Sequence, residues 1–457
     1  MNLTIAEILR ATRGKLVRGA PNTVITQIST DSRTLSEGDL FVAISGERFD
    51  GHDFIDVARH AGACGVVVSK RVETNLPIVV EVKNSLIALG DIAAFHRSKF
   101  NLPIVAITGS NGKTTTKDMT ASVLSRRFSV FQSEKNYNNQ VGVPSRLLEL
   151  DDNSQMGVLE IGTNQPGEIE RLSQIAKPTI GVVTNIGHSH LEFLGSLEGV
   201  AEEKGYLVER VERAVLNADD PMTPRLACRV CGEITTFGSR NDADISAHEI
   251  ETQSTGKPSF TLQINGKNVI RVDLPCLGIH NVSNALAAAS IGVWAGLTSA
   301  EIRDGLENYQ PANMRMQPIE YNGLYIINDA YNSNPNSLKQ ALEFLSKTRT
   351  SGKRIAVLGD MLELGQESEK LHFNAGMNLP ANIDVLISVG ARSLDIIRGA
   401  AGRIETTFAC ETPEAAAKQL HKSSQSGDVV LIKGSRGMKL EQIVDEYHTD
   451  CHTTHGS

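Results

Sequence analysis

The chain has 457 residues, a formal net charge of −8 and no long basic run. This acidic balance argues against nucleic acid as a partner, and no uncharged apolar stretch approaches the ~20 residues that span a membrane. The six cysteines are scattered, as expected for a reduced cytoplasmic protein. The length favours about three domains.

Residues 1–98 predict an N-terminal α/β domain of short strands and helices. The first 19 residues predict an amphipathic helix rather than a signal peptide, because they lack a continuous apolar core and a small-residue cleavage site. Residues 57–70 predict a helix leading into a buried strand, and residues 76–82 predict another strand. The polar, glycine-rich stretch 29–54 is typical of a binding loop.

Residues 99–312 predict a central domain in which strands and helices alternate. Short apolar runs end in polar or glycine residues, at 102–108, 156–161, 179–185 and 213–219. This alternation predicts a parallel sheet covered by helices on both faces. Residues 244–273 alternate in polarity around an Asn265-Gly266 turn, which predicts a hairpin. Residues 280–296 predict a closely packed helix of small residues.

Residues 313–457 predict a C-terminal, Rossmann-like α/β domain. The character of the sequence changes around 310–318, where we place the boundary. Apolar runs and helical stretches then alternate again, which predicts a second, smaller parallel sheet. The runs that predict its strands are 325–330, 354–360, 385–390 and 429–434.

Residues 106–117, AITGSNGKTTTK, predict a phosphate-binding loop that is shorter than the usual pattern. Glycines let backbone N–H groups turn toward an anion, and the following helix N-terminus adds positive potential. Lys113 can reach the β- and γ-phosphates, and the Thr114 hydroxyl can ligate Mg²⁺. A plain glycine turn would not require the Lys-Thr pair. ATP is favoured over GTP because residues 216–221, LNADDP, lack the lysine of a guanine-reading motif.

Further polar residues lie at the expected carboxyl edge of the same sheet. Glu160 ends an apolar run, so it is either a Mg²⁺ ligand or a solvated strand-end glutamate. His188 and His190 follow the next run, where an isolated histidine is more often structural. Lys204, on a helix predicted over 197–210, is by position alone a solvated lysine.

Seen in chain order, these motifs resemble those of the Mur ligase family, the ATP-dependent amide ligases of peptidoglycan synthesis. The matching stretches are DSR, DGHDF, TGSNGKTT, EIGTNQPGEI, NIGHSHLE, the lysine helix, GIHNVSNA, NDAYNSNPNS, GDMLELG and KGSRG. Within the family, NYNNQVGVP, DAYNSNP and GDMLELG resemble the member that adds D-alanyl-D-alanine to UDP-N-acetylmuramoyl-tripeptide. The sibling that adds the third residue carries an Asp-Asn-Pro-Arg motif, which is absent here.

The resemblance implies an N-terminal UDP-sugar domain, a central ATP domain, a C-terminal domain for the incoming dipeptide, and two Mg²⁺ sites. The implied catalytic residues and metal ligands are Lys113, Thr114, Glu160, His190 and a carbamylated Lys204; His188 is off-pattern and structural. The implied ATP contacts are Gly109, Ser110, Asn111, Gly112, Lys113, Thr114, Thr115, Asn281, Asn284, Arg315 and Asp329. The implied substrate contacts are Ser32, Arg33, Asn136, Asn138, Asn139, Thr163, Tyr331, Asn332, Asn334, Ser435 and Arg436.

Two alternatives stay open at this point. One is a sibling ligase with a single amino acid as acceptor, and the other is an ATP-gated regulatory protein that binds a UDP-sugar without ligation. The third residue of the tripeptide fits either meso-diaminopimelate or lysine. We expect a cytoplasmic monomer.

Overall fold

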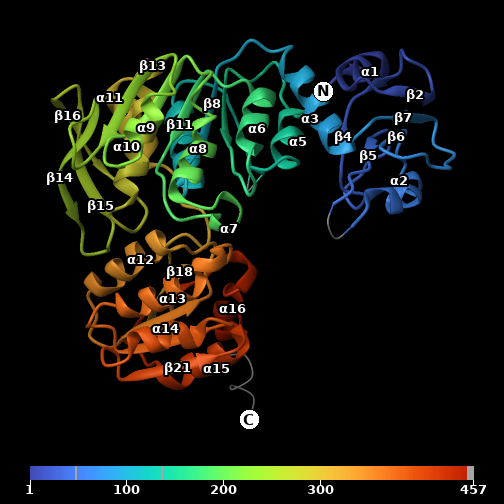
Figure 1. Ribbon diagram of the computed structural model, residues 1–457. Helices are drawn as coiled ribbons and strands as arrows, with labels where there is room; N and C mark the ends of the chain where they lie inside the picture. Colours follow the sequence, from blue (N-terminus) through green and yellow to red (C-terminus); the bar gives the residue numbers. More distant parts are fainter. Residues whose placement is uncertain (47–48, 135–136, 450–457) are drawn as a thin grey trace.

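The computed structural model describes residues 1–46, 49–134 and 137–449. The predicted substrate contact Asn136 lies outside the described residues. Figure 1 shows the chain folded into an N-terminal region in blue, a central region running from teal to yellow, and a C-terminal region in orange and red. The C-terminal region lies against one edge of the central region, so these two parts of the chain meet.

The N-terminal region contains a sheet with strand order β2-β7-β6-β5-β4 and a small sheet of β1 and β3. Its elements are β1 (Leu3–Thr4), α1 (Ile5–Thr12), β2 (Lys15–Arg18), β3 (Val24–Ile25), β4 (Ile28–Ser29), β5 (Leu40–Val42), η1 (Gly51–Phe54), α2 (Ile55–His60), β6 (Gly65–Val68), β7 (Ile78–Glu81) and α3 (Ser85–Arg97). The predicted N-terminal helix is shorter than expected. A capping box between Thr4 and Glu7 begins it, and Arg13 in left-handed conformation ends it.

The central region contains a sheet with strand order β16-β15-β14-β13-β12-β11-β8-β10-β9. Its strands are β8 (Ile104–Thr108), β9 (Val130–Gln132), β10 (Met156–Glu160), β11 (Ile180–Val183), β12 (Arg213–Asn217), β13 (Glu233–Gly238), β14 (Ile245–Thr252), β15 (Pro258–Ile264) and β16 (Lys267–Asp273). Its helices are α4 (Lys113–Leu124), α5 (Gly142–Leu147), α6 (Glu168–Ala176), α7 (Leu191–Leu194), α8 (Leu197–Gly205), α9 (Thr223–Ala227), α10 (Asn281–Trp294) and α11 (Ser299–Glu307).

The pairing of these strands confirms the predicted parallel sheet. Strands β9 to β14 pair in parallel around β8. The predicted hairpin is also confirmed, since β15 and β16 pair antiparallel around the turn at Asn265 and Gly266. β14 adds a further antiparallel partner to β15. One helix is shorter than predicted, because α8 ends at Gly205, and residues 206–210 form turns.

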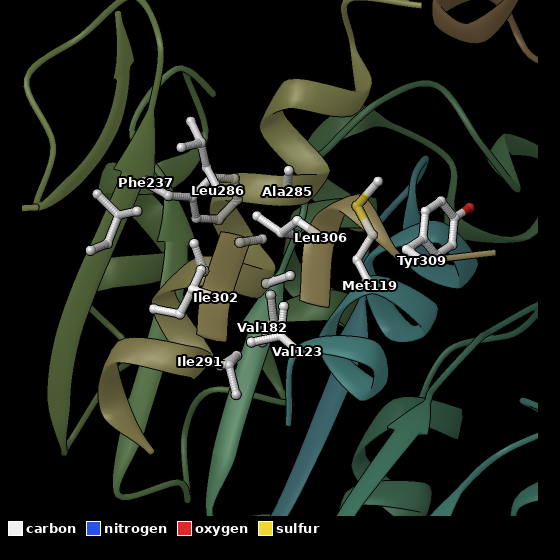
Figure 2. Close-up of a cluster of buried hydrophobic side chains, with 14 of the residues drawn as sticks. Met119, Val123, Val182, Phe237, Ala285, Leu286, Ile291, Ile302, Leu306 and Tyr309 are labelled. Atoms are coloured by element: carbon white, nitrogen blue, oxygen red, sulfur yellow. The ribbon is translucent and has the colours of Figure 1, made fainter. Parts of the chain in front are cut away.

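Alternate residues of the central strands point to opposite faces of the sheet, and helices cover both faces. Val105 and Ile107 of β8 belong to one core cluster with α4, α10 and α11. Figure 2 shows part of this cluster, with Met119, Val182, Leu286 and Leu306 drawn among its side chains. The residues between them in β8, Ile104 and Ala106, face a second cluster.

This second core cluster runs without a break from the N-terminal region into the central region. It joins Ile5 and Val67 of the N-terminal region to Leu159 and Ile169 of the central one. Helix α3 packs against both α5 and α6. Apolar packing therefore holds the N-terminal region against the central sheet. Such packing stabilises the folded chain by roughly 25 cal/mol for each Å² of apolar surface removed from water.

The C-terminal region contains a sheet with strand order β17-β18-β22-β19-β20-β21, in which only β17 pairs antiparallel among the described residues. Its strands are β17 (Gln317–Tyr321), β18 (Leu324–Asp329), β19 (Arg354–Gly359), β20 (Val385–Val389), β21 (Thr406–Cys410) and β22 (Val429–Lys433). Its helices are α12 (Pro335–Lys347), η2 (Gly365–Glu367), α13 (Ser368–Met377), α14 (Ser393–Ala400), α15 (Pro413–Ser423), η3 (Arg436–Met438) and α16 (Glu441–Thr449). No helix in the described part of the chain is long and apolar enough to cross a membrane.

Candidate active site

A cavity of about 400 Å³ lies where the central and C-terminal regions meet. It collects most of the predicted site residues: Ser110, Asn111, Gly112, Lys113, Thr114, Thr115, Asn138, Glu160, Thr163, His190, Asn281, Asn284, Arg315, Asp329, Tyr331, Asn332, Ser435 and Arg436. Other predicted residues are not in its lining: Ser32, Arg33, Gly109, Asn139, Lys204 and Asn334. Of this second set, Gly109 belongs to the phosphate loop itself, and Asn334 donates a hydrogen bond to Asn111 of the same loop.

The phosphate loop connects β8 to α4, as predicted, and its two glycines have backbone angles that other residues rarely adopt. Gly109 has φ +149° and Gly112 has φ +80°. A Cβ atom on Gly109 would lie 1.8 Å from the Thr184 hydroxyl, and one on Gly112 would lie 2.2 Å from Asn284 Oδ1. Glycine is therefore required at both positions, for conformation and for space.

The loop is held from behind by the segment that follows β11. Asn185 Oδ1 accepts a hydrogen bond from the Asn111 backbone N–H at 2.9 Å, and Thr184 donates to the Asn111 carbonyl at 2.6 Å. The Ser110 hydroxyl donates to the Gly187 carbonyl at 3.0 Å. These bonds fix the loop before any ligand arrives, which lowers the entropy lost on binding.

Lys113 begins α4 and reaches back over the loop. Its Nζ donates to the Gly109 carbonyl at 2.8 Å. Burial lowers the pKa of Lys113, while the charge of Glu160 opposes this shift. A cation at this helix N-terminus adds to the positive end of the helix dipole, so the loop favours anionic groups such as phosphates.

Glu160 ends β10 as predicted, and it is not a solvated strand-end residue, because only 3% of it is exposed. Its Oε2 accepts a hydrogen bond from Thr114 Oγ1 at 2.7 Å, and its Oε1 accepts one from Asn138 Nδ2 at 2.7 Å. Arg315 of the C-terminal region donates to Thr114 Oγ1 at 2.8 Å. The end of β10, the start of α4 and the C-terminal region therefore meet at one point.

The neighbouring side chains fit a divalent cation. A threonine hydroxyl and a buried carboxylate oxygen already lie side by side at Thr114 and Glu160, and hard oxygen ligands suit Mg²⁺. The described residues contain no group of three or more His, Cys, Asp and Glu side chains close enough to hold a metal ion. The predicted ligand set instead combines a threonine, a glutamate, a histidine and a lysine.

His190 lies directly before α7 and lines the cavity. Its Nδ1 lies 2.6 Å from Oε2 of Glu363, a residue of the C-terminal region. This contact lowers the pKa of Glu363. His188, predicted to be structural, is exposed to solvent.

Lys204 lies on α8 and is buried, with 1% of the residue exposed. The prediction of a solvated helix lysine is therefore wrong. Burial, with a contribution from the charge of Lys113, lowers the pKa of Lys204 to about 7. Position in the helix could not reveal this, because the burial depends on how α8 packs against other elements, among them α6, α7 and α9. At neutral pH a substantial share of the amine is uncharged.

Glu203, the residue before Lys204, ties α8 to the segment after β10. Its carboxylate accepts hydrogen bonds from the backbone N–H groups of Gly167 at 2.7 Å and Ile169 at 2.8 Å, at the start of α6. The Thr163 hydroxyl also donates to it at 3.3 Å. Thr163, predicted to contact the peptide, is thus fixed to the helix that carries Lys204.

A second group of residues forms the side of the cavity around the start of α10. Asn284 donates to Asn281 Oδ1 at 2.8 Å, and Asn281 donates to the Leu277 carbonyl at 2.7 Å. His280 also lines the cavity, and burial lowers its pKa to about 4. The Asn284 amide lies next to Gly112 of the phosphate loop.

Asp329 and Lys433 form an ion pair at the carboxyl ends of two adjacent parallel strands, β18 and β22. The two charged groups lie 2.6 Å apart, and Lys433 Nζ also donates to the Asn332 carbonyl at 2.9 Å. Asp329 in turn accepts a hydrogen bond from the Met316 backbone N–H at 3.1 Å. The pair holds the segment that carries Tyr331 and Asn332 into the cavity.

The other predicted residues of the C-terminal region differ in what they contact. The Arg315 guanidinium lies 4.0 Å from the centre of the Tyr331 ring. Asn334 caps α12 and donates across the interface to Asn111 Oδ1 at 2.7 Å. Ser435 accepts a hydrogen bond from the Leu362 backbone N–H at 2.9 Å, and Arg436 pairs with Glu441 at 2.6 Å.

Two sets of predicted contacts lie away from the cavity. Asn139 accepts hydrogen bonds from the backbone N–H groups of Val141 and Gly142, which gives it a turn-forming role here. In the N-terminal region, Arg33 pairs with Asp31 at 2.7 Å and its side chain is 86% exposed. Ser32 lies between them on the same loop.

The cavity also contains residues that were not predicted from the sequence, among them His280, Glu363 and Lys433. A sequence signal existed for Lys433, because it ends an apolar run at the expected carboxyl edge of a parallel sheet. His280 and Glu363 lie inside quoted motifs, GIHNVSNA and GDMLELG, but nothing local distinguishes them. Their placement depends on how the two regions dock.

Comparison with known families matches three parts of the chain. "Mur ligase family, catalytic domain" matches residues 24–99, "Mur ligase middle domain" matches residues 107–292, and "Mur ligase, glutamate ligase domain" matches residues 314–436. Among curated relatives, a Bacillus subtilis protein is 35% identical, over 97% of this chain and 98% of its own. An Escherichia coli protein is 36% identical with the same coverage. Both are named UDP-N-acetylmuramoyl-tripeptide–D-alanyl-D-alanine ligase.

Solved structures agree with these relatives. The chain is similar to a crystal structure of MurF from Acinetobacter baumannii, with a TM-score of 0.91, 31% identity, and coverage of 98% of this chain and 99% of that one. It is also similar to MurF ligase from Thermotoga maritima in complex with ADP, with a TM-score of 0.82, 28% identity, and coverage of 93% and 98%. The predicted α/β fold of three domains with parallel sheets is confirmed.

Proposed function

The chain belongs to the Mur ligase family and is an ATP-dependent amide ligase, and from this premise we propose that it joins D-alanyl-D-alanine to UDP-N-acetylmuramoyl-tripeptide. The relatives that bear the name of this reaction are 35% and 36% identical over nearly the whole chain. The observation that carries the proposal is the cavity in which Thr114 and Glu160 of the central region meet Arg315 of the C-terminal region.

The proposed reaction has two steps. First, an oxygen of the tripeptide carboxylate attacks the γ-phosphorus of ATP, the bond to the bridging oxygen breaks, and ADP leaves. Second, the amine of D-alanyl-D-alanine attacks the acyl carbon of the resulting acyl phosphate, phosphate leaves, and the nitrogen loses a proton. Phosphoryl transfers of this kind depend on positioning and on neutralising charge.

The residues of the cavity are suited to the first step. The backbone N–H groups of the phosphate loop and Lys113 Nζ are placed to bind the β- and γ-phosphates. Arg315 adds a second cation to the same cavity from the C-terminal region. Arg315 stacks on Tyr331 and donates to Thr114, so its guanidinium is held in place before ATP binds. Preorganised charge of this kind stabilises the transition state without reorganisation during the reaction.

We propose Thr114 and Glu160 as ligands of one Mg²⁺, and Glu160, His190 and a carbamylated Lys204 as ligands of another. When bound, Mg²⁺ supplies positive charge that offsets the repulsion between the γ-phosphate and the incoming carboxylate. Lys204 suits carbamylation because its pKa is lowered to about 7, which leaves neutral amine to attack CO₂. Loss of a proton then gives a carboxylate-like group.

We further propose a division of labour between domains with boundaries at 98/99 and 312/313. The N-terminal domain holds the UDP group through Ser32 and Arg33, while Asn138 and Thr163 face the peptide. The C-terminal domain binds the dipeptide, whose terminal carboxylate suits Ser435 and Arg436. A cytoplasmic monomer remains part of the proposal.

Phosphate release tests the proposal. The full chain is supplied with ATP, Mg²⁺ and UDP-N-acetylmuramoyl-tripeptide, and the acceptor is varied among D-alanyl-D-alanine, D-alanine, L-lysine, meso-diaminopimelate and D-glutamate. We expect steady release with the dipeptide only. The tripeptide is supplied in two forms, with lysine or meso-diaminopimelate as its third residue.

The other outcomes identify the alternatives. Equal or faster phosphate release with a single amino acid would show that the chain is a sibling ligase of the family, with that amino acid as its acceptor. Nucleotide binding without release under any combination would favour a regulatory protein.

A further inference from the structure

The contact between His190 and Glu363 joins two residues that both have an unusual backbone conformation. His190 has φ +54° and Glu363 has φ +63°, in the left-handed region that residues other than glycine seldom occupy. Such strain persists where the surrounding structure over-determines it, and it concentrates at functional sites. Here the two strained residues come from different regions of the chain and face each other across their interface.

The backbone around this pair is also in close contact. The Glu192 backbone N–H donates to the Glu363 carbonyl at 3.3 Å. A Cβ atom on Gly365 would lie 3.1 Å from Glu192 Cα, so glycine permits this approach. In Figure 1, α7, which begins directly after His190, lies at the edge of the central region that faces the orange C-terminal region.

Side-chain contacts also join the C-terminal region to the segment around α7. The His190 side chain is 19% exposed and that of Glu363 is 45% exposed, and His190 Nδ1 lies 2.6 Å from Glu363 Oε2. Leu371 of α13 packs onto the apolar cluster that contains Leu191 and Leu194 of α7. The C-terminal region therefore contacts α7 through a charged group and through apolar packing.

We propose that Glu363 is a positioning residue that orients His190 for a divalent cation when the C-terminal region closes; this rests on the metal site proposed above. A metal-binding histidine is normally held through its other ring nitrogen by a carboxylate or carbonyl group. Glu363 faces Nδ1, which leaves Nε2 for the cation. Because the carboxylate belongs to the C-terminal region, cation binding and closure favour each other by thermodynamic linkage.

Glu363→Gln tests this proposal with little change of shape. The amide keeps the size of the side chain and removes its charge. Glu367→Gln is a matched control, since Glu367 lies in η2 nearby and pairs with Lys370 of the same region. His190→Ala defines which bound cation belongs to the His190 site.

The readout is Mn²⁺ binding to the full chain, followed by electron paramagnetic resonance without nucleotide or peptide, and the radius of gyration with and without Mn²⁺. We expect Glu363→Gln to weaken the Mn²⁺ class removed by His190→Ala about tenfold or more, and to reduce compaction. Glu367→Gln should behave as the unaltered chain. In the double variant, Glu363→Gln should add nothing to His190→Ala.

Unchanged Mn²⁺ affinity and compaction in Glu363→Gln would overturn the proposal, as would a His190→Ala variant that removes no class of bound Mn²⁺. These measurements involve no ligation. Failure of the substrate panel would therefore count against the proposed reaction, while these titrations would still decide the role of Glu363.

Discussion

The phosphate loop and residues 31–33 are both predicted to bind nucleotides, yet the structure builds them in different ways. Asn111 of the loop contacts Thr184, Asn185 and, across the interface, Asn334. Arg33 is held by its own neighbour, Asp31, and its side chain is 86% exposed. The first site is assembled from several segments, whereas the second is local.

The two sites therefore differ in how much conformational entropy is lost when a ligand binds. A loop fixed by neighbouring segments has lost its conformational freedom on folding, so ligand binding costs little further ordering. An exposed arginine must be ordered by its ligand, and its present ion pair with Asp31 is worth little because solvent screens it. We therefore expect changes in the loop to affect the chemical step and changes in residues 31–33 to affect substrate affinity.

The largest expected effect is that of Lys113→Ala. Removing the cation over the phosphates should lower kcat by about a hundredfold or more, because the interaction acts on charge in the transition state. Phosphate release under saturating substrates measures this. Lys370→Ala, which removes an exposed lysine of the C-terminal region, should leave kcat unchanged. A Lys113→Ala enzyme with normal kcat would contradict the proposed role of the phosphate loop in the chemical step.

Lys204→Ala should have the next largest effect, a loss of roughly ten- to hundredfold in kcat, as for a lost group at a metal site. Acetate should partly restore turnover by occupying the vacated space, and it should not accelerate the unaltered enzyme. A carbamate signal from ¹³CO₂ in the unaltered chain, absent in Lys204→Ala, reports the modification directly. Normal turnover of Lys204→Ala in CO₂-depleted buffer would contradict it.

Arg33→Ala should raise KM for the UDP-linked substrate about tenfold, the loss expected of a charge-assisted hydrogen bond worth roughly 1.5 kcal/mol. The values of kcat and of KM for ATP should stay within about twofold. Arg71→Ala, another exposed arginine of the N-terminal region, is the control. A fall in kcat with unchanged KM would show that residues 31–33 act on the chemical step.

The smallest effect concerns His280 and pH. Its pKa is lowered to about 4, first by burial and then by the charge of Lys433. The unfolded chain therefore binds more protons between pH 6.5 and 4, so the contribution to stability is fully present above pH 6.5 and is lost as pH falls toward 4. NMR titration of the ring, assigned with His280→Gln, should give a pKa near 4; a value near 6.5 would contradict this.

The sequence alone determined the local elements of this protein. Apolar runs that end in polar residues predicted β8, β10, β11 and β12, because a buried parallel strand needs a continuous apolar stretch. The glycines of the loop predicted its conformation, since few other residues adopt those angles. Glu160 could be placed at the same edge as the loop, because the carboxyl ends of parallel strands meet there.

How the regions meet could not be predicted from local sequence patterns. Lys204 looks solvated in its own helix and is buried once α8 packs against other elements, among them α6, α7 and α9. Glu363 reaches His190 only through docking of the C-terminal region, 173 positions further along the chain by their numbers (363 − 190). Contacts of this kind depend on the summed packing of whole elements, and no local pattern of polarity records which surfaces will pack together.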